Sequence, residues 1–190
     1  MTFSAARYWN QRYRDGRTSG KGSEGRSAAH KAQVVNDLIR AEDVQSVADW
    51  GVGDGTVLSM LTRNIDYYGY DISEFAIARL KREWKHEPRR HFSTLEDAGA
   101  PLVDLSLSFD VIFHCIDDFD YEMHLRRVFA SSKKLVLIHS SDHNGGRTAR
   151  HVKWRRFTND VDRITPQWVL ESAPVLATEI GFHRYRKREA

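Results

Sequence analysis

The 190-residue chain has little of what secreted and membrane-spanning proteins depend on. It contains one cysteine, Cys115, so no disulfide can form within the chain. It has no continuous apolar run of roughly 18 residues, the length that spans a bilayer, and its first residues are polar rather than signal-like. The sequence shows no internal repeat. These absences favour a reducing compartment, and we expect a cytoplasmic protein without a membrane partner.

Composition and charge bound the size of the core and the chemistry of the surface. With 41% hydrophobic residues, a chain of 190 residues can bury one substantial core, so we expect a single domain over residues 1–190. The formal charge of +3 is unevenly distributed, because residues 143–190 contain ten Lys or Arg and five Asp or Glu. A basic region is a solvated surface in many proteins, and it also suits an anionic acceptor or a nucleic acid.

The most informative stretch of the sequence is a strand followed by glycines. Residues 46–50 form an apolar strand pattern that contains Asp49, and three glycines follow at alternate positions: Gly51, Gly53 and Gly55. Glycines at this spacing allow a tight turn and let a ligand lie against the backbone, where a Cβ atom would collide with it. A second strand-like run ends on Asp71, which is placed to accept hydrogen bonds from both hydroxyls of a ribose. The pattern predicts a nucleoside-containing ligand at the carboxyl ends of two adjacent parallel strands.

The acidic residues in this stretch distinguish between nucleoside ligands. The dinucleotide fingerprint is G-x-G-x-x-G, in which a helix N-terminus receives a pyrophosphate. This chain has G-x-G-x-G instead, with Asp49 before it and Asp54 inside it. Two carboxylates would repel a pyrophosphate, but they suit a ligand that carries an ammonium and a sulfonium. The stretch resembles motif I of the class I S-adenosylmethionine-dependent methyltransferases, and the run from Asp71 to Ser73 resembles their acidic motif II.

The resemblance, together with the alternation of strand and helix patterns, implies a fold and a cofactor. The fold is an α/β, doubly wound, mostly parallel sheet of the Rossmann-like class, with a short antiparallel C-terminal hairpin. The cofactor is S-adenosyl-L-methionine, which becomes S-adenosyl-L-homocysteine. The residues expected to bind it are Asp49, Gly51, Gly53, Gly55, Asp71 and Ile72, with Glu96 at the adenine amine, Arg12 at the methionine carboxylate and Tyr13 as stacking surface.

Hydrophobic periodicity predicts the elements of this fold. Strands are expected at residues 46–50, 67–70, 90–93, 109–114, 134–139, 168–172 and 182–186. Helices are expected at residues 28–40 with Ser27 as the N-cap, from 56 to about 63, after the cap Ser73, at 121–130 and at 158–164. Before this core of residues 28–190, residues 1–27 divide into a short aromatic segment and a mobile loop rich in glycine and serine. In methyltransferases of this class such a segment often folds over the cofactor, and a helix packed on the sheet edge is an equal alternative.

Polar residues follow the fourth and fifth predicted strands, where a doubly wound fold places its chemistry. We nominate His114 as a general base for a hydroxyl acceptor, with Asp117 or Asp142 orienting it or replacing it. The alternative is that His114 lines the cofactor pocket through its backbone. Methyltransferases that grip adenine or a side-chain amide carry Asn/Asp-Pro-Pro-Tyr/Phe here, whereas this chain has His-Cys-Ile-Asp at residues 114–117. An oxygen acceptor is therefore favoured.

Two other groups near these strands are interpreted as having no catalytic role. His139, Asp142, His143 and His151 fall within 13 residues. This set is too rich in imidazole for magnesium and lacks the spacing of a zinc site, so we expect no metal. Cys115 lies beside an apolar strand, without the Pro-Cys context of some nucleophilic cysteines, and is interpreted as a small hydrophobic filler.

Two further segments bear on the acceptor. Tyr8-Trp9-x-x-Arg12-Tyr13 and the run from His151 to Thr158 resemble small methyltransferases found beside polysaccharide biosynthesis enzymes. The leading hypothesis is O-methylation of a small-molecule or saccharide hydroxyl, with Lys153, Arg155 and Arg156 available to steer an anionic acceptor. The alternatives are a nucleic-acid methyltransferase, a non-catalytic S-adenosylmethionine-binding module, and a nicotinamide-dependent reductase, which the acidic glycine run opposes. The sequence leaves the oligomeric state open.

Overall fold

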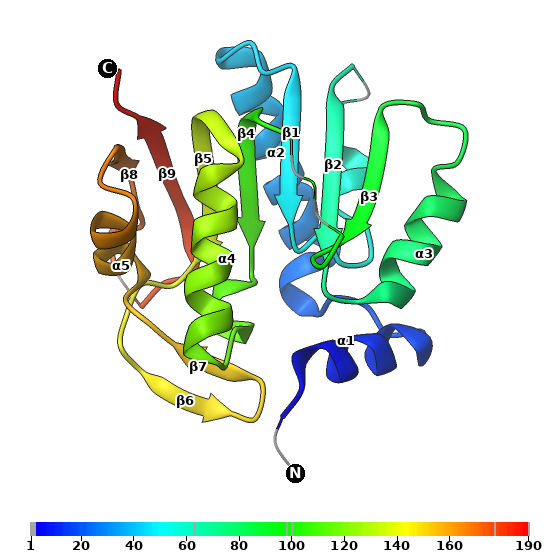
Figure 1. Ribbon diagram of the computed structural model, residues 1–190, viewed down its shortest axis with the longest axis horizontal. Coiled ribbons are helices and arrows are strands. Elements are labelled where there is room, and N and C mark those ends of the chain that lie inside the picture. Colours follow the sequence, from blue (N-terminus) through cyan, green and yellow to red (C-terminus); the bar gives the residue numbers. More distant parts are fainter. Residues whose placement is uncertain (1–2, 63, 98, 100, 177, 190) are drawn as a thin grey trace. The chain divides into compact units, whose positions relative to one another are not determined.

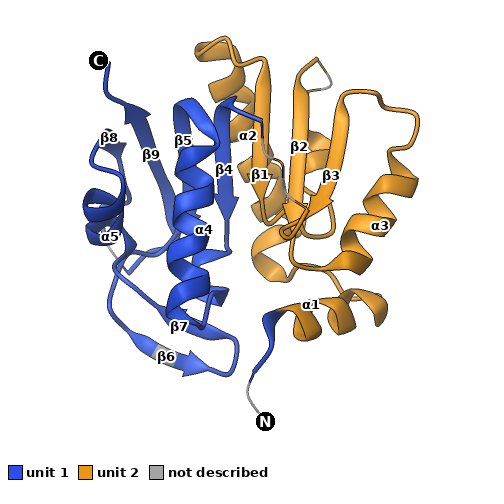
Figure 2. Ribbon diagram, viewed as in Figure 1, with its two compact units in different colours: residues 1–5, 101–190 blue, residues 6–100 orange. Residues whose placement is uncertain are grey.

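The chain forms two compact units in the computed structural model (Figure 2). Unit 1 comprises residues 101–190 together with residues 1–5, and unit 2 comprises residues 6–100. The structure describes residues 3–62, 64–97, 99, 101–176 and 178–189. Within these ranges, no helix has the length and apolar character that crossing a bilayer requires. The single domain expected over residues 1–190 remains a prediction.

Unit 2 is built on three parallel strands in the order β3-β2-β1 (Figure 1). The strands are β1 (Ser46–Trp50), β2 (Asp66–Asp71) and β3 (Arg90–Thr94), and all three were expected from the periodicity. Four of the five β1 side chains are buried, as expected for a parallel strand that is covered on both faces. The remaining elements of this unit are α1 (Ala5–Arg14), η1 (Lys21–Ser23), α2 (Gly25–Ala41), η2 (Leu58–Met60) and α3 (Glu74–Glu83).

Helix α2 begins earlier than its apolar pattern predicts. Its buried apolar face is the expected one, formed by Ala28, Ala32, Val35, Leu38 and Ile39. The predicted N-cap, Ser27, lies inside the helix, and its N–H donates to the Glu24 carbonyl oxygen at 3.1 Å. Glu24 takes the cap position with an extended backbone, at φ −125° and ψ 156°. The first turn is exposed and polar, so a periodicity that reports only the buried face misses it.

The helix predicted from Thr56 to about Arg63 is wrong. The chain forms only the short turn η2 in this region, and Arg63 lies outside the described residues. Asp54 explains the difference, because its Oδ1 accepts hydrogen bonds from the Thr56 N–H (3.0 Å) and the Thr56 hydroxyl (2.6 Å). Such local side-chain bonds compete with the helical backbone pattern.

The predicted Ser73 cap of α3 is confirmed. Its hydroxyl oxygen accepts a hydrogen bond from the Ala76 N–H at 3.2 Å. Asn10 of α1 contributes to the same cap, because its Oδ1 accepts from the Phe75 N–H (3.0 Å) and from the Ser73 hydroxyl (2.8 Å). These bonds tie α1 to the N-terminus of α3.

Unit 1 contains four strands in the order β4-β5-β9-β8. They are β4 (Val103–Phe109), β5 (Ser132–Ser140), β8 (Trp168–Ser172) and β9 (Gly181–Lys187). β4 and β5 are parallel, β9 is antiparallel to β5, and β8 is antiparallel to β9, which confirms the predicted C-terminal hairpin. The other elements are η3 (Ile112–His114), α4 (Asp118–Ala130), the strand pair β6 (Gly146–Ala149) and β7 (Val152–Trp154), and α5 (Phe157–Ile164). α4 lies across β4 and β5 (Figure 1), whereas the β6–β7 pair is absent from the predicted pattern.

The strand predicted at residues 109–114 is wrong in position. β4 ends at Phe109, and the chain then turns at Asp110 (φ 58°) into η3. The β4–β5 register pairs Leu107 with Leu137 and Phe109 with His139. The apolar run after Asp110 therefore belongs to the connection that follows the strand.

Buried serines hide β4 from an apolar pattern. Ser106 and Ser108 are at most 1% exposed. Ser106 Oγ accepts from the Ser131 hydroxyl at 3.1 Å, and Ser108 Oγ lies 2.8 Å from His124 Nε2 on α4. Because these partners satisfy the hydroxyls, polar residues can be buried at strand positions that normally hold apolar ones.

Candidate functional site

Three left-handed glycines form the turn after β1. Gly51, Gly53 and Gly55 have φ values of 115°, 58° and 76°. The Gly51 N–H donates to the Tyr70 carbonyl oxygen at 2.8 Å, which holds the turn against the end of β2. A Cβ atom on Gly53 would lie 2.4 Å from Ser19 Oγ and 3.1 Å from the Tyr13 hydroxyl oxygen. Both the conformation and the close approach therefore require glycine.

Asp71, the last residue of β2, is bound to this turn. Its Oδ2 accepts from the Gly53 N–H (2.9 Å), and its Oδ1 accepts from the Ser73 N–H (2.8 Å). Burial raises the pKa of Asp71 to about 6, although these backbone hydrogen bonds oppose the rise. Each carboxylate oxygen keeps a second lone pair. The expected bonds to ribose hydroxyls are compatible with this geometry and remain a prediction.

Asp49 is a buried carboxylate with one unsatisfied oxygen. The Tyr67 hydroxyl donates to its Oδ2 at 2.5 Å. Its Oδ1 is buried and has no hydrogen-bond partner among the residues that the structure describes. Burial raises the pKa of Asp49 to about 6, against the effect of the Tyr67 hydrogen bond. A buried acceptor of this kind is costly unless a donor meets it.

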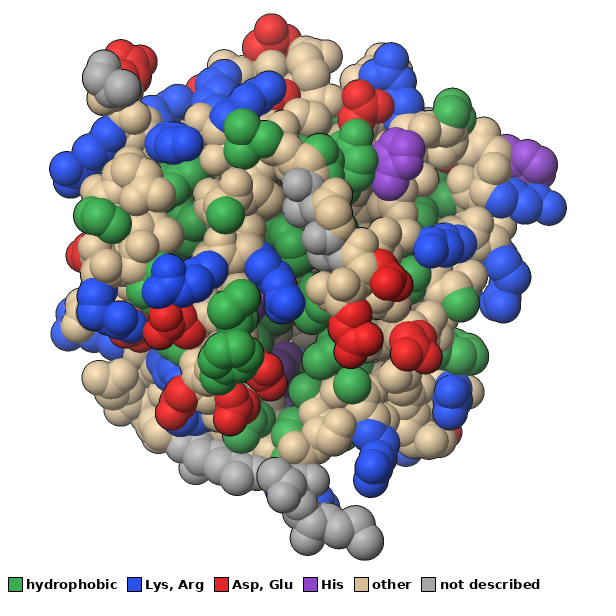
Figure 3. All heavy atoms as spheres, in the orientation of Figure 1, with side chains coloured by type: hydrophobic (Ala, Val, Ile, Leu, Met, Phe, Trp, Pro, Cys, Tyr) green, Lys and Arg blue, Asp and Glu red, His purple; other side chains and the backbone are tan. Residues whose placement is uncertain are grey.

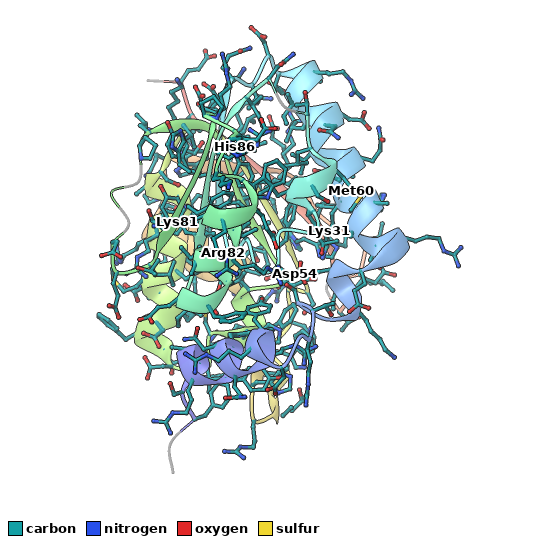
Figure 4. The ribbon with its side chains drawn as sticks, turned by 90° about the vertical axis from the view of Figure 1, so that its right-hand side faces the viewer. Lys31, Asp54, Met60, Lys81, Arg82 and His86 are labelled. Atoms are coloured by element: carbon teal, nitrogen blue, oxygen red, sulfur yellow. The ribbon has the colours of Figure 1, made fainter. Side chains whose placement is uncertain are left out.

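A buried lysine, which the motifs do not single out, lies close enough to Asp49 to act on its charge. Lys31 of α2 is 1% exposed, and its Nζ donates to the Gly22 carbonyl oxygen at 2.6 Å. Burial dominates the raised pKa of Asp49, and the positive charge of Lys31 opposes it. Figure 4 labels Lys31 on α2 and Asp54 in the glycine turn. The sequence does carry a signal for this residue, because Lys31 interrupts the apolar face of α2.

The segment before α2 is bonded to the glycine turn. Tyr13 is 4% exposed, and its hydroxyl oxygen lies 3.1 Å from Ser19 Oγ. The Ser19 N–H donates to Asp54 Oδ2 (2.7 Å), and the Asp54 N–H donates to Ser19 Oγ (3.1 Å). Although partial burial raises the pKa of Asp54, hydrogen bonds from Thr56 and Ser19 lower it below its usual value. Tyr13 and Ser19 thus contact the backbone against which the ligand is expected to lie.

Arg12, Ile72 and Glu96, the other predicted cofactor residues, have different surroundings. Arg12 Nε donates to the Thr18 carbonyl oxygen at 2.6 Å. Ile72 directly follows Asp71, the last residue of β2, and its expected contact with the cofactor remains a prediction. Glu96 is exposed in the segment after β3. The expected contacts of Arg12 with a carboxylate and of Glu96 with adenine remain predictions.

His114 lies in η3, directly after β4 in unit 1. Its Nδ1 is 2.7 Å from the His151 carbonyl oxygen, and the two imidazole rings stack with their centroids 5.4 Å apart. A carbonyl oxygen can only accept, so Nδ1 is the donor and, in the neutral ring, Nε2 carries the lone pair. The predicted base therefore has a suitable tautomer.

Asp117 and Asp142 act as helix caps. Asp117 is exposed, and its Oδ1 accepts from the Phe119 N–H (2.9 Å) and the Asp120 N–H (3.1 Å) at the start of α4. Asp142 is buried, and it accepts from the N–H and the hydroxyl of Thr158 at the start of α5. The group at His114 Nδ1 is a backbone carbonyl, and the predicted roles of Asp117 and Asp142 in orienting or replacing His114 remain predictions.

Arg155 is a buried cross-link rather than a surface cation. Its guanidinium donates to the carbonyl oxygens of Cys115 (2.5 Å) and Ile116 (3.1 Å), and to Asp118 Oδ1 (2.7 Å). It also lies 4.3 Å from the centre of the Tyr121 ring. These bonds fix the connection between η3 and α4. The suggestion that Arg155 steers an anionic acceptor is therefore wrong.

The thiol of Cys115 has a raised pKa, and residues that were considered for a metal bond to other protein groups. Burial raises the pKa of the Cys115 thiol to about 12, which keeps it protonated, as a structural filler would be. Over the described part of the chain, no three His, Cys, Asp or Glu side chains are grouped so that they could hold a metal ion. Two of the four residues considered for a metal have other partners: His139 bonds Asp110, and Asp142 bonds Thr158.

The His139–Asp110 pair is a feature that sequence reasoning missed. His139 Nδ1 lies 2.7 Å from Asp110 Oδ1, at the carboxyl ends of β5 and β4. The side chains are 15% and 17% exposed. The signal was obscured because the predicted strand ran through Asp110, which placed this residue inside a strand instead of at its end.

The sequence matches no protein-family model and no curated protein. Solved structures, however, resemble the chain over nearly its whole length. The magnesium protoporphyrin IX methyltransferase of Synechocystis PCC 6803 with bound SAM gives a TM-score of 0.69 at 13% identity, covering 98% of this chain and 99% of that one. The chain has the class I methyltransferase fold.

Two other solved structures support the same assignment. The N-methyltransferase NodS of Bradyrhizobium japonicum WM9 in complex with SAH gives a TM-score of 0.70 at 13% identity, covering 98% of this chain and 100% of that one. The CcbJ methyltransferase of Streptomyces caelestis gives 0.71 at 11% identity, with the same two coverages of 98% and 100%. The predicted methyltransferase fold, with its Rossmann-like α/β arrangement, is thus confirmed.

Proposed function

We propose that the protein is an S-adenosyl-L-methionine-dependent methyltransferase that acts on a hydroxyl of a small molecule or saccharide. The observation that carries the proposal is the unsatisfied, buried Oδ1 of Asp49 beside three left-handed glycines. An anionic or apolar ligand would leave this oxygen unpaired, whereas the ammonium of an amino-acid moiety would donate to it. Solved structures of the same fold that hold SAM or SAH support the choice of cofactor.

Unit 2 offers a group for each part of this cofactor. Asp49 would bind the ammonium, and Lys31, whose charge acts on Asp49, is an additional candidate beside Arg12 for the carboxylate. Asp71 would bind the ribose hydroxyls, and Glu96 the adenine amine. The cofactor supplies a methyl group activated by a sulfonium. The protein's task is then to hold the acceptor in line and to exclude water.

The residues after β4 favour an oxygen acceptor. The amine-directed signature is absent from residues 114–117, and His114 in its neutral form can accept a proton at Nε2. The fold alone does not select the acceptor atom, because NodS is named as an N-methyltransferase and a Burkholderia thailandensis structure as an O-methyltransferase family protein. A hydroxyl acceptor needs a base within hydrogen-bond reach, which contributes about 10²–10⁴-fold to the rate.

A nucleic-acid substrate has less support from the surface. On the face shown in Figure 3, Lys and Arg side chains are interspersed with Asp and Glu and form no continuous basic stripe. Several cations of the basic region are paired within the chain: Lys153 and Arg155 with Asp118, Arg163 with Glu122, and Arg184 and Arg186 with Glu171. These pairs reduce the charge that is available to phosphates.

The first test is calorimetric titration with S-adenosylmethionine and S-adenosylhomocysteine, with NADH as a control ligand. We expect micromolar binding of the sulfur ligands by the parent protein. Asp49→Asn should weaken it at least tenfold, because the amide keeps the shape of the carboxylate but loses its charge. The matched control is Asp66→Asn on β2, whose carboxylate is exposed and distant from the turn in sequence. Equal affinities of parent and Asp49→Asn, or binding of NADH instead, would contradict the proposal.

A second pair of variants tests the glycine turn. Gly53→Ala places a methyl group 2.4 Å from Ser19 Oγ in a left-handed conformation, so it should displace the segment and abolish measurable binding. Gly99→Ala has no atom within 4 Å of the added carbon and should bind like the parent. A Gly53→Ala protein that binds normally would show that the cofactor does not lie along this turn.

A further inference from the structure

The ends of β4 and β5 hold a carboxylate and an imidazole in one hydrogen-bonded pair. The register pairs Phe109 with His139, and Asp110 is the next residue along the chain. Asp110 is bound to His139 twice, because its N–H donates to the His139 carbonyl oxygen at 2.9 Å and its Oδ1 lies 2.7 Å from His139 Nδ1. A double tie of this kind fixes both the position and the rotation of the imidazole.

Asp110 adopts a backbone conformation that needs support. Its φ of 58° is one of two positive values among the described residues other than glycine. Left-handed residues cost free energy and persist where the surroundings hold them, often at functional sites. Here the left-handed turn brings the carboxylate back to the β5 histidine.

The pair is partly enclosed by aromatic rings and not sealed from solvent. The His139 ring lies 4.7 Å from the Phe182 ring and 6.2 Å from the Phe109 ring, measured between centroids. With side chains 15% and 17% exposed, His139 and Asp110 differ from the fully buried His124 pair of the same unit. Low surrounding polarity strengthens the bond between imidazole and carboxylate.

We propose that His139 is a general base for the acceptor hydroxyl and that Asp110 is its positioning residue. This inference rests on the proposed O-methyltransferase function. A carboxylate only accepts, so His139 Nδ1 is the donor and Nε2 carries the lone pair. The carboxyl ends of parallel strands are the edge at which doubly wound sheets bind their ligands. Compared with His114, whose Nδ1 meets a neutral carbonyl, His139 has an ionised partner that stabilises its protonated form.

The proton transfer balances without any further reagent. The acceptor O–H bond breaks, the proton goes to His139 Nε2, and the electron pair forms the new bond between oxygen and the methyl carbon. The electron pair of the methyl–sulfur bond returns to the sulfonium sulfur. The resulting imidazolium is held beside the Asp110 carboxylate until it releases its proton to water.

A second imidazole lies near His139. His183 of β9 is close enough for the two imidazoles to affect each other, and burial lowers the pKa of His183, which keeps it neutral. Asp142 acts on His183 from the segment after β5. Phe109 and Phe182 contribute no charge. Asp110 is therefore the charged group that hydrogen-bonds directly to the His139 ring, and its removal should be visible in the tautomer of that ring.

The tautomer is the first readout, because it needs no acceptor. ¹⁵N NMR of the histidine rings in the parent protein should show His139 protonated at Nδ1 at neutral pH, with Nε2 unprotonated. Asp110→Asn should shift the His139 proton from Nδ1 towards Nε2, while the resonances of His114 stay in place. A His139 ring protonated at Nε2 in the parent, or unchanged by Asp110→Asn, would overturn the proposal.

Turnover is the second readout, measured as S-adenosylhomocysteine formed with sugar nucleotides and glycans as probe acceptors. His139→Gln should reduce kcat by about 10²-fold or more and change cofactor affinity less than twofold, and it should remove the acid limb of the pH–rate profile. A His139→Gln protein with the parent kcat and pH profile would overturn the base role, as would tight cofactor binding without any methylated hydroxyl. Absence of cofactor binding would instead refute the proposed function. In that case the His139 tautomer would still show whether Asp110 positions the imidazole.

Discussion

Asp49 of unit 2 and Arg155 of unit 1 use their buried polar atoms in opposite ways. In unit 2, the carboxylates of Asp49 and Asp71 are buried at the end of a parallel sheet with pKa values raised to about 6, and one Asp49 oxygen has no partner among the described residues. In unit 1, Arg155 and Asp142 bond to carbonyl oxygens, a carboxylate or helix N–H groups of their own chain. The first arrangement leaves a group for a ligand to satisfy, whereas the second completes the fold.

This difference distinguishes residues that could bind a ligand from residues that stabilise the fold. A charged residue near a strand end is a binding candidate when its buried atoms lack partners, as in Asp49. It is a structural residue when its hydrogen bonds go to other groups of the same chain, as in Arg155. The following changes test whether the contrast holds, in order of decreasing effect.

The largest expected effect is on the stability of unit 1. Arg155→Met removes charged hydrogen bonds to two carbonyl oxygens and to Asp118, so the free energy of unfolding should fall by roughly 3 kcal/mol. Arg156→Met, at an exposed neighbouring position, should change it by less than about 0.5 kcal/mol. Urea denaturation of the two variants measures the difference. Equal stabilities would mean that the Arg155 bonds are not part of the structural frame.

Acid should destabilise the two units differently. Burial lowers the pKa of His124 to about 4, below its value near 6.5 in the unfolded chain. The folded state therefore favours the neutral ring, and this contributes stability above pH 6.5. The contribution is lost as the pH falls from 6.5 to 4, because the unfolded chain then binds a proton that the folded state does not. The loss is on the order of 3 kcal/mol. Asp49 and Asp71 have the opposite effect on stability. Because their carboxyl pKa values are raised, these residues favour the folded state at low pH and oppose it as the pH rises through 6.

Hydrogen exchange followed by mass spectrometry at pH 7 and pH 4.5 checks this expectation. Residues 118–140 should exchange faster at the lower pH, and residues 46–71 should not lead the opening. His124→Gln removes the titrating group and should flatten the acid dependence of α4. Acid-induced exchange that begins in β1 and β2 would reverse the assignment.

Asp71 should affect both binding and stability. Asp71→Ala removes a charged hydrogen-bond acceptor for the ribose, which should weaken cofactor binding by roughly 1.5–3 kcal/mol. The structure adds a cost that the sequence does not predict, because the N–H groups of Gly53 and Ser73 lose their acceptor and the free energy of unfolding should fall as well. Calorimetry and thermal unfolding of the same sample separate the two effects. Unchanged affinity would remove Asp71 from the cofactor site.

The smallest expected effect is on the stability of α3, whose N-terminus is capped by Ser73. Ser73→Ala should lower the free energy of unfolding by about 1 kcal/mol, because α3 loses the acceptor for the Ala76 N–H. Ser59→Ala, at an exposed position of η2, is the control for loss of a hydroxyl. A loss well above this size would indicate that the Asn10 bond to the same hydroxyl couples α1 to the cap.

The fold was accessible from the sequence wherever side-chain polarity and burial agree. β1, β5 and the Ser73 cap follow directly from apolar runs and a local capping signal. Prediction failed at β4, where buried serines find partners on α4 and at Ser131, and after Gly55, where Asp54 binds Thr56 and replaces a helix by a turn. Both failures come from hydrogen bonds that a periodicity does not contain.

The candidate site likewise contains features that local sequence predicts and features that depend on tertiary contacts. The glycine spacing and Asp71 are local signals, so their proximity could be predicted from two strand ends. Lys31 and the Asp110–His139 pair depend on which residues the fold brings together across 18 to 29 positions of sequence. The sequence could not predict that Asp49 Oδ1 lacks a hydrogen-bond partner, because whether a buried polar atom is hydrogen-bonded depends on three-dimensional packing.

The raised pKa of the Cys115 thiol has a practical consequence for spectroscopy. A thiol with a pKa near 12 reacts slowly with maleimides at neutral pH, since the thiolate is the reactive species. The natural chain therefore serves as an unreactive background for site-directed labelling. A cysteine introduced at Val175, which is 97% exposed, would carry a spin label or fluorophore selectively. Paired with a second label at Lys21, it would let distances between the two units be followed as the cofactor is added.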